Sequence, residues 1–91
     1  MRDYQYPLDL DWTTDEMVIV MDMWEKLEQA NETNIKAEEF LRTYQKFKTV
    51  VKSLGEERRL GREFEKISGY SLYHTLQEAK KNPKGRLKMK G

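Results

Sequence analysis

The sequence predicts an all-α protein: a compact array of four helices, or five if a short extra turn forms, with an extended aromatic strap at the N-terminus. Three observations predict this class. Apolar residues recur at the three- and four-residue spacing of a helix face, serine or threonine caps precede three of these stretches, and polar or glycine-containing breaks separate them. The 91 residues are expected to form one domain over residues 1–81, with the strap at 1–12 and a basic, flexible tail at 82–91.

The composition favours a cytoplasmic protein. The chain contains no cysteine, which excludes disulfides, thiolate catalysis and cysteine-based metal sites. Its longest apolar run, Met17 to Met21, is far shorter than the roughly 20 residues that span a bilayer. The first residues show no apolar core of the kind found in a secretory signal. No membrane association is expected.

Charge is unevenly distributed, although the net charge is only +1. Residues 1–32 contain nine acids and two bases, a net charge of −7, whereas residues 33–91 contain fifteen bases and seven acids, a net charge of +8. This asymmetry indicates either an electrostatic partner or mutual attraction between the two parts of the chain.

The strap at residues 1–12 is predicted to be extended because Pro7 disfavours the helical conformation of the residue before it. Tyr4, Tyr6 and Leu8 alternate with other residues, so the strap presents one apolar side. We expect these side chains to pack on the helices with their hydroxyls in water; the alternative is a docking strip for another protein. The fifth, short turn is placed near Leu8 to Trp12.

The first helix is predicted over residues 14–30. Thr13 and Glu16 have the spacing of a capping box, and Trp12 and Met17 stand where a hydrophobic staple forms. Its apolar stripe consists of Met17, Val20, Met21, Trp24 and Leu27, widened by Ile19 and Met23.

The second helix is predicted from residue 35 or 36 to residue 51, after a polar loop at 31–34. Its buried stripe consists of Ala37, Phe40, Leu41, Tyr44, Phe47 and Val51. Ser53 and Glu56 predict a second capping box at the start of the third helix, which ends near residue 68. That helix should turn Leu60, Phe64 and Ile67 inward, and the glycine at position 61 within it indicates a close helix crossing.

Gly69 stands where a helix ends in a left-handed residue, and Ser71 caps the fourth helix, which runs to about Lys81. The side chains predicted to be buried on this helix are Leu72, Tyr73, Leu76 and Ala79. Beyond it, Pro83 and Gly85 break the helix, and residues 82–91 are therefore expected to fray.

Catalytic, cofactor and metal sites are not predicted. The only dense group of carboxylates is Asp9, Asp11, Asp15 and Glu16, and it lacks the glycine and glutamate positions of an EF-hand loop. Ser71 and His74 are three residues apart, but a nucleophile and its base also need an orienting acid and an oxyanion site. We interpret Ser71 as a cap and His74 as a surface residue, and predict that the protein is not an enzyme.

Basic residues provide the candidate interaction surface. Arg58, Arg62 and Lys66 recur along one edge of the third helix, and further bases follow the fourth. The predicted surface consists of Arg58, Arg62, Lys66, Lys80, Lys81, Lys84 and Arg86.

The leading hypothesis is a non-catalytic protein-interaction module with an unknown protein partner, present as a monomer or weak homodimer. The alternative is a nucleic-acid-binding accessory protein that uses the basic C-terminal half. The third and fourth helices have the outline of a helix-turn-helix, but acids interrupt their basic faces. Nucleic-acid binding is therefore expected to be at most weak and non-specific.

Three segments of the chain together resemble uncharacterised protein family 0223 of Firmicutes. They read Tyr4-x-Tyr6-Pro7-Leu8-Asp9-x-Asp11-Trp12, Tyr44-x-x-Phe47-Lys48 and Phe64-Glu65-Lys66-x-Ser68-Gly69-Tyr70-x-x-Tyr73. The resemblance covers nearly the full length and implies a small, all-helical, cytoplasmic bacterial protein. It implies no catalytic residue, cofactor or partner, because that family has no assigned activity.

Overall fold

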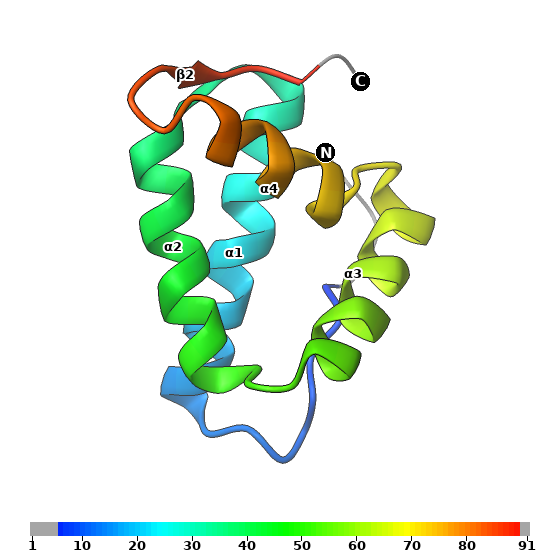
Figure 1. The fold of residues 1–91 in the computed structure, drawn as a ribbon. Helices are drawn as coiled ribbons and strands as arrows, with labels where there is room; N and C mark the ends of the chain where they lie inside the picture. Colours follow the sequence, from blue (N-terminus) through cyan, green and yellow to red (C-terminus); the bar gives the residue numbers. More distant parts are fainter. Residues whose placement is uncertain (1–5, 90–91) are drawn as a thin grey trace.

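Four helices and one two-stranded sheet build the described part of the chain, residues 6–89 of this computed structural model (Figure 1). In chain order the elements are α1 (Thr14–Glu32), β1 (Ile35–Lys36), α2 (Ala37–Val50), α3 (Leu54–Ser68), α4 (Leu72–Lys81) and β2 (Arg86–Leu87). Helices α1 and α2 pack side by side, and α4 crosses them near one end. Helix α3 lies below α4 in Figure 1, at the right of α1 and away from α2. The predicted four-helix array is confirmed, and none of the helices within residues 6–89 is long and apolar enough to cross a membrane.

The N-terminal end of α1 is capped by the residues that the sequence predicts. Thr13 Oγ1 accepts a hydrogen bond from the backbone N–H of Glu16 at 3.2 Å, and Glu16 Oε1 accepts one from the N–H of Thr13 at 2.9 Å. This reciprocal pair is the predicted capping box. The short extra turn is also present, since the N–H of Trp12 donates to the carbonyl of Asp9 at 3.1 Å. Trp12 is half-buried against the core, and its contact with Met17 stays a prediction.

The core is centred on Trp24, whose side chain is fully buried. Its ring stacks on Phe64 with a centroid distance of 4.8 Å and meets Phe47 edge-on at 5.6 Å. Its indole Nε1 donates to the carbonyl of Pro7 at 3.2 Å. Trp24 of α1 therefore contacts residues of α2, α3 and the strap. Burial of this one large aromatic ring holds the four segments together.

Of the strap side chains predicted to pack on the helices, Tyr6 does so and Leu8 does not. Tyr6 is half-buried, its ring lies 5.9 Å from that of Phe64, and its hydroxyl donates to Glu28 at 2.7 Å. The hydroxyl is thus bonded to a carboxylate rather than only to water. Leu8 is exposed, and Tyr4 lies outside the described residues.

Three side chains predicted to be buried are exposed instead. Met21 is 36 % exposed, Ile67 42 % and Tyr73 66 %. Each lies at the edge of its helix's apolar stripe, where no other element within residues 6–89 covers it. On α4 the inward position belongs to Thr75, which is fully buried and whose hydroxyl accepts from Asn31 Nδ2 at 3.2 Å. Helical periodicity locates a stripe, but its width depends on the partner helices.

The segment expected to be a flexible tail contains a turn and a strand. Residues 86–87 pair antiparallel with residues 35–36, which the sequence had placed in a loop or at the start of a helix. Leu87 lies opposite Ile35 and is only 4 % exposed. Pro83 and Gly85 do end α4 as predicted, but they form a turn that brings the chain back to the core, where Leu87 finds an apolar site.

Gly61 lies where α3 meets α4, as expected, but the crossing does not require glycine. A Cβ at this position would lie 3.7 Å from Leu72 Cβ, an ordinary van der Waals contact. Replacing Gly61 with alanine should therefore raise the free energy of unfolding by about 0.5–1 kcal/mol, because alanine favours the helix interior. Urea unfolding measures the change.

The matched control is Gly69→Ala. Gly69 has φ +83° at the C-terminal end of α3, a conformation that costs alanine roughly 1–2 kcal/mol. The two substitutions should shift the urea midpoint in opposite directions. A Gly61→Ala protein that is less stable than the wild type would show that the crossing is tighter than described.

Candidate functional site

A groove of about 530 Å³ opens between α3 and α4. It combines exposed apolar side chains with basic ones, and its principal lining residues are Leu54, Arg58, Arg62, Tyr73, Leu76 and Lys80. Leu76 is buried in the floor, whereas Leu54 and Tyr73 are 56 % and 66 % exposed. Large apolar side chains gathered in a concave surface are typical of binding sites.

Helical spacing places these residues on two facing sides. Leu54, Arg58 and Arg62 follow one another at four-residue intervals along α3. Tyr73 and Lys80 are seven residues apart on α4, which again corresponds to one face. Because residues three, four or seven apart share a helix face, each helix presents an apolar residue near its own N-terminal end, followed by two bases on α3 and one on α4.

The floor of the groove contains a buried carboxylate that is already neutralised. Glu57, only 8 % exposed, accepts hydrogen bonds from the hydroxyl of Tyr44 at 2.9 Å and from Lys48 Nζ at 2.7 Å. Burial, then the hydrogen bond to Glu57 and its negative charge, raises the pKa of Tyr44 well above its ordinary value. Tyr44 therefore remains a hydrogen-bond donor. These contacts tie α3 to α2 and leave little negative charge from Glu57 at the groove.

The charge that faces solvent in the groove is positive overall. Arg58, Arg62 and Lys80 are all exposed and line it, and Glu65 is the exposed acid among its lining residues. Arginine presents a planar set of donors that matches a carboxylate. The groove thus suits a ligand that offers both apolar groups and negative charge.

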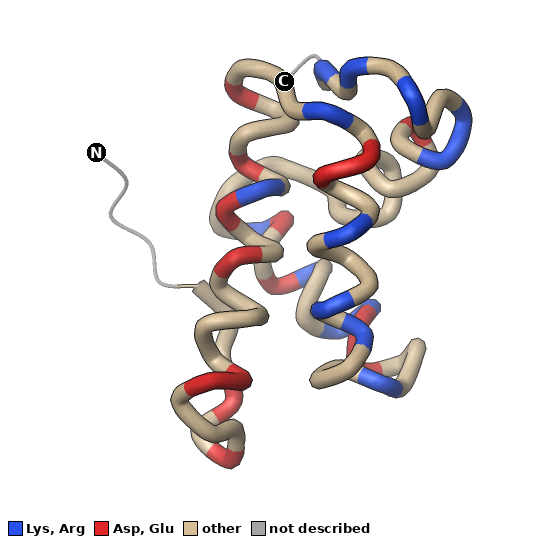
Figure 2. Tube along the Cα trace, turned by 90° about the vertical axis from the view of Figure 1, so that its left-hand side faces the viewer, with Lys and Arg blue, Asp and Glu red and all other residues tan. Residues whose placement is uncertain are grey.

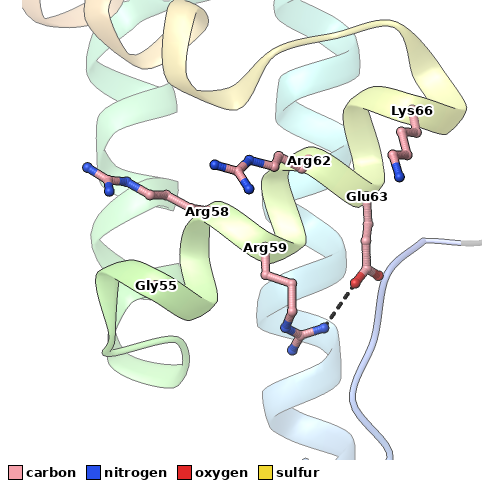
Figure 3. Close-up of a pocket in the computed structure, with 6 residues that line it drawn as sticks. All are labelled: Gly55, Arg58, Arg59, Arg62, Glu63 and Lys66. Atoms are coloured by element: carbon pink, nitrogen blue, oxygen red, sulfur yellow. Dashed lines mark hydrogen bonds and ion pairs between the residues drawn. The ribbon is translucent and has the colours of Figure 1, made fainter.

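The outer side of α3 holds a second, smaller basic depression of about 460 Å³ (Figure 3). Lys66 lies there with Arg58 and Arg62, while Arg59 forms an ion pair with Glu63 at 2.9 Å. Figure 3 shows Arg58 and Arg62 extending to one side of the helix, away from the Arg59–Glu63 pair. Arg58 and Arg62 are therefore shared between the depression and the groove.

The other predicted surface residues lie elsewhere. Lys81 pairs with Glu78 at 3.1 Å, and Arg86 Nε donates to Asn34 Oδ1 at 2.9 Å. Lys84 is exposed in the turn after α4. Figure 2 shows this turn as a basic region at the upper right, whereas acidic residues follow α1 and the segment that leads into it. The structure thus brings Lys80 to the groove with Arg58 and Arg62 but does not bring Lys81, Lys84 or Arg86 there.

Ser71 and Asp9, two of the remaining candidates for chemistry, each accept a hydrogen bond from the backbone. Ser71 Oγ accepts from the backbone N–H of His74 at 3.2 Å, which makes Ser71 the cap of α4, and the His74 side chain is exposed. Asp9 accepts from the N–H of Asp11 at 2.9 Å. Within residues 6–89, no three histidine, aspartate or glutamate side chains are grouped closely enough to hold a metal ion.

Sequence reasoning identified the bases of the groove but missed its two exposed apolar side chains, Leu54 and Tyr73. It placed Tyr73 in the core and gave Leu54 no role. The available signal was the four-residue spacing of Leu54, Arg58 and Arg62, which continues the basic stripe of α3 toward its N-terminus.

The fold and groove define a small, mostly α-helical protein with a groove lined by basic and apolar side chains. The chain belongs to the uncharacterised protein family UPF0223, whose sequence profile matches residues 3–88. The predicted resemblance is thereby confirmed. Similar proteins, each called UPF0223 protein, occur in Enterococcus faecalis (71 % identical over 98 % of this chain and 97 % of the relative) and Streptococcus sanguinis (49 %; 97 % and 96 %). A further relative from Bacillus cytotoxicus is 47 % identical over 86 % of this chain and 88 % of its own length.

Proposed function

We propose that the protein is a non-catalytic, cytoplasmic protein-interaction module whose α3–α4 groove binds an acidic and apolar segment of a partner protein. The observation that carries this proposal is the pair of exposed side chains, Leu54 and Tyr73, in a groove with three bases. Exposed apolar surface of this kind is stabilised when a partner covers it, because burial removes it from water.

Charge and apolar area have different roles in such a complex. Arg58, Arg62 and Lys80 would attract and orient carboxylates, an effect that falls as salt screens exposed charges. Leu54 and Tyr73 would supply the part of the affinity that persists at physiological salt. Nucleic-acid binding relies far more on phosphate neutralisation and is correspondingly salt-sensitive, and it makes no use of the leucine in the groove.

Fluorescence anisotropy tests the proposal with a labelled, short helical peptide that bears leucine and phenylalanine on one face and glutamate on the other. The wild-type protein should bind this peptide at ~150 mM salt, and Arg62→Glu should weaken binding at least about tenfold. The matched control is Arg59→Glu, which makes the same charge change on the same helix outside the groove. Equal binding by wild type and Arg62→Glu would contradict the proposal.

A labelled DNA duplex provides the comparison with the alternative function. It should bind only weakly at ~50 mM salt and not measurably near ~150 mM, by the counterion argument. Tight, sequence-selective DNA binding at ~150 mM salt would instead support the nucleic-acid-binding accessory.

A further inference from the structure

The solvent side of α1 presents a surface with the opposite charge. Val18 is 59 % exposed, Met21 is exposed beside it, and both line a depression of about 280 Å³ together with Asp22 and Glu25. Asp22 is partly neutralised by Lys26 at 3.2 Å, but its side chain remains 40 % exposed. These four residues, Val18, Met21, Asp22 and Glu25, are called the acidic face of α1.

The acidic face and the groove open on opposite sides of α2. Tyr44 lines the groove, whereas Lys46 lines the depression at the acidic face. Residues two apart on an α-helix point about 200° apart around its axis. The acidic face of α1 therefore does not cover the groove of its own molecule, and the charge asymmetry of the sequence is not cancelled between these two surfaces within one copy.

The two surfaces match each other in chemistry and spacing. Each has two exposed apolar side chains beside charges of one prevailing sign, with a single exposed charge of the other sign among the described residues that line it, Lys46 at the acidic face and Glu65 in the groove. Asp22 and Glu25 are three residues apart and Arg58 and Arg62 four apart, which corresponds to about 4.5 Å and 6 Å along their helix axes. The net charge of +1 means that two copies scarcely repel each other at long range.

We propose that a second copy of this chain occupies the groove, with the acidic face of α1 from one copy against α3 and α4 of the next. This inference rests on the proposed function, because it names the source of the acidic and apolar segment. Since the two contacting surfaces differ, the association is head-to-tail and can continue from copy to copy. Exposed ion pairs are weak and screened by salt, so the association strengthens at low salt and high protein concentration.

Sedimentation velocity tests this with two charge-reversed variants of the full chain. One is Asp22→Lys with Glu25→Lys on the acidic face, and the other is Arg58→Glu with Arg62→Glu in the groove. The wild type should self-associate at ~50 mM salt in a series that reaches about 1 mM protein, and each variant alone should associate at least about tenfold more weakly. An equimolar mixture of the variants should regain association, because each reversed surface then meets a complementary one.

A matched control separates surface charge from net charge. Arg59→Glu with Lys84→Glu changes the net charge as much as the groove variant does, at exposed positions outside the groove. This control should sediment like the wild type, and circular dichroism verifies that all variants are folded.

Two outcomes would overturn the inference: a wild type that stays monomeric throughout the low-salt series, or variants that remain monomeric when mixed. If either occurs while the acidic peptide still binds the groove, the proposed function stands and only the second copy is excluded as occupant. Loss of both self-association and peptide binding would overturn both.

Discussion

Replacing Trp24 with alanine should lower the free energy of unfolding by about 3–5 kcal/mol, as expected for a fully buried tryptophan. The ring stacks on Phe64, meets Phe47 edge-on, and donates its N–H to the carbonyl of Pro7. Alanine would leave a cavity between α1, α2 and α3, and the surrounding side chains relax only partly into such a space. The effect therefore extends to three helices and the strap.

Urea unfolding followed by far-ultraviolet circular dichroism measures this loss without relying on tryptophan fluorescence. Trp24→Phe is the informative control, because it retains an aromatic ring but removes the hydrogen bond to Pro7. Its loss should be smaller, and the part due to the unpaired carbonyl is about 1–3 kcal/mol. A loss below about 1 kcal/mol for Trp24→Ala would be incompatible with the fully buried position.

Removing residues 82–91 should also destabilise the fold, by about 2–5 kcal/mol, the range for losing a large buried aliphatic side chain. The deletion removes Leu87 from the core and β2 from its pairing with β1. It also takes away the carbonyl of Gly85, which accepts from the N–H of Ala37 at 3.0 Å. If residues 82–91 were only a frayed basic tail, their removal would leave the fold intact.

Thermal and urea unfolding of the truncated chain measure the effect, and two point variants resolve its cause. Leu87→Ala should reproduce most of the loss, because it empties the buried site and leaves the turn in place. Lys88→Ala, at an exposed position next to it, should change the midpoint little. Unchanged stability of both the truncated chain and Leu87→Ala would mean that β2 contributes nothing to the folded state.

The ends of the helices were predictable because capping depends on residues close together in the chain. Thr13 and Ser71 each accept from a backbone N–H three residues on, and Gly69 adopts the left-handed conformation. Ser53 accepts from the N–H of Glu56 in the same way, but only this half of the predicted second capping box forms. Such contacts need no tertiary information, and the observed starts of α1, α3 and α4 agree with the sequence prediction.

The candidate site was predictable only in part. The four-residue spacing of Arg58 and Arg62 showed that these bases share one side of a helix, whatever that helix packs against. Whether a side chain at the edge of an apolar stripe is buried depends on a second element that covers it. The sequence of α4 alone does not show this, and the prediction that Tyr73 is buried was therefore wrong. The groove exists only because α4 lies beside α3, so the spacing of Leu54 with Arg58 and Arg62 placed these residues on one side of α3 but did not indicate a groove.

The sequence by itself determined the four-helix class, the starts of α1, α3 and α4, and membership of UPF0223, because these follow from local spacing, caps and motifs. Only the tertiary structure decided that residues 35–36 pair with residues 86–87, that Leu87 is buried, and that the acidic face of α1 and the basic groove open on opposite sides of α2. The physical reason is distance along the chain: a two-residue strand has too little local preference to be recognised, and it forms because a partner some fifty residues away completes its hydrogen bonds and covers its apolar side.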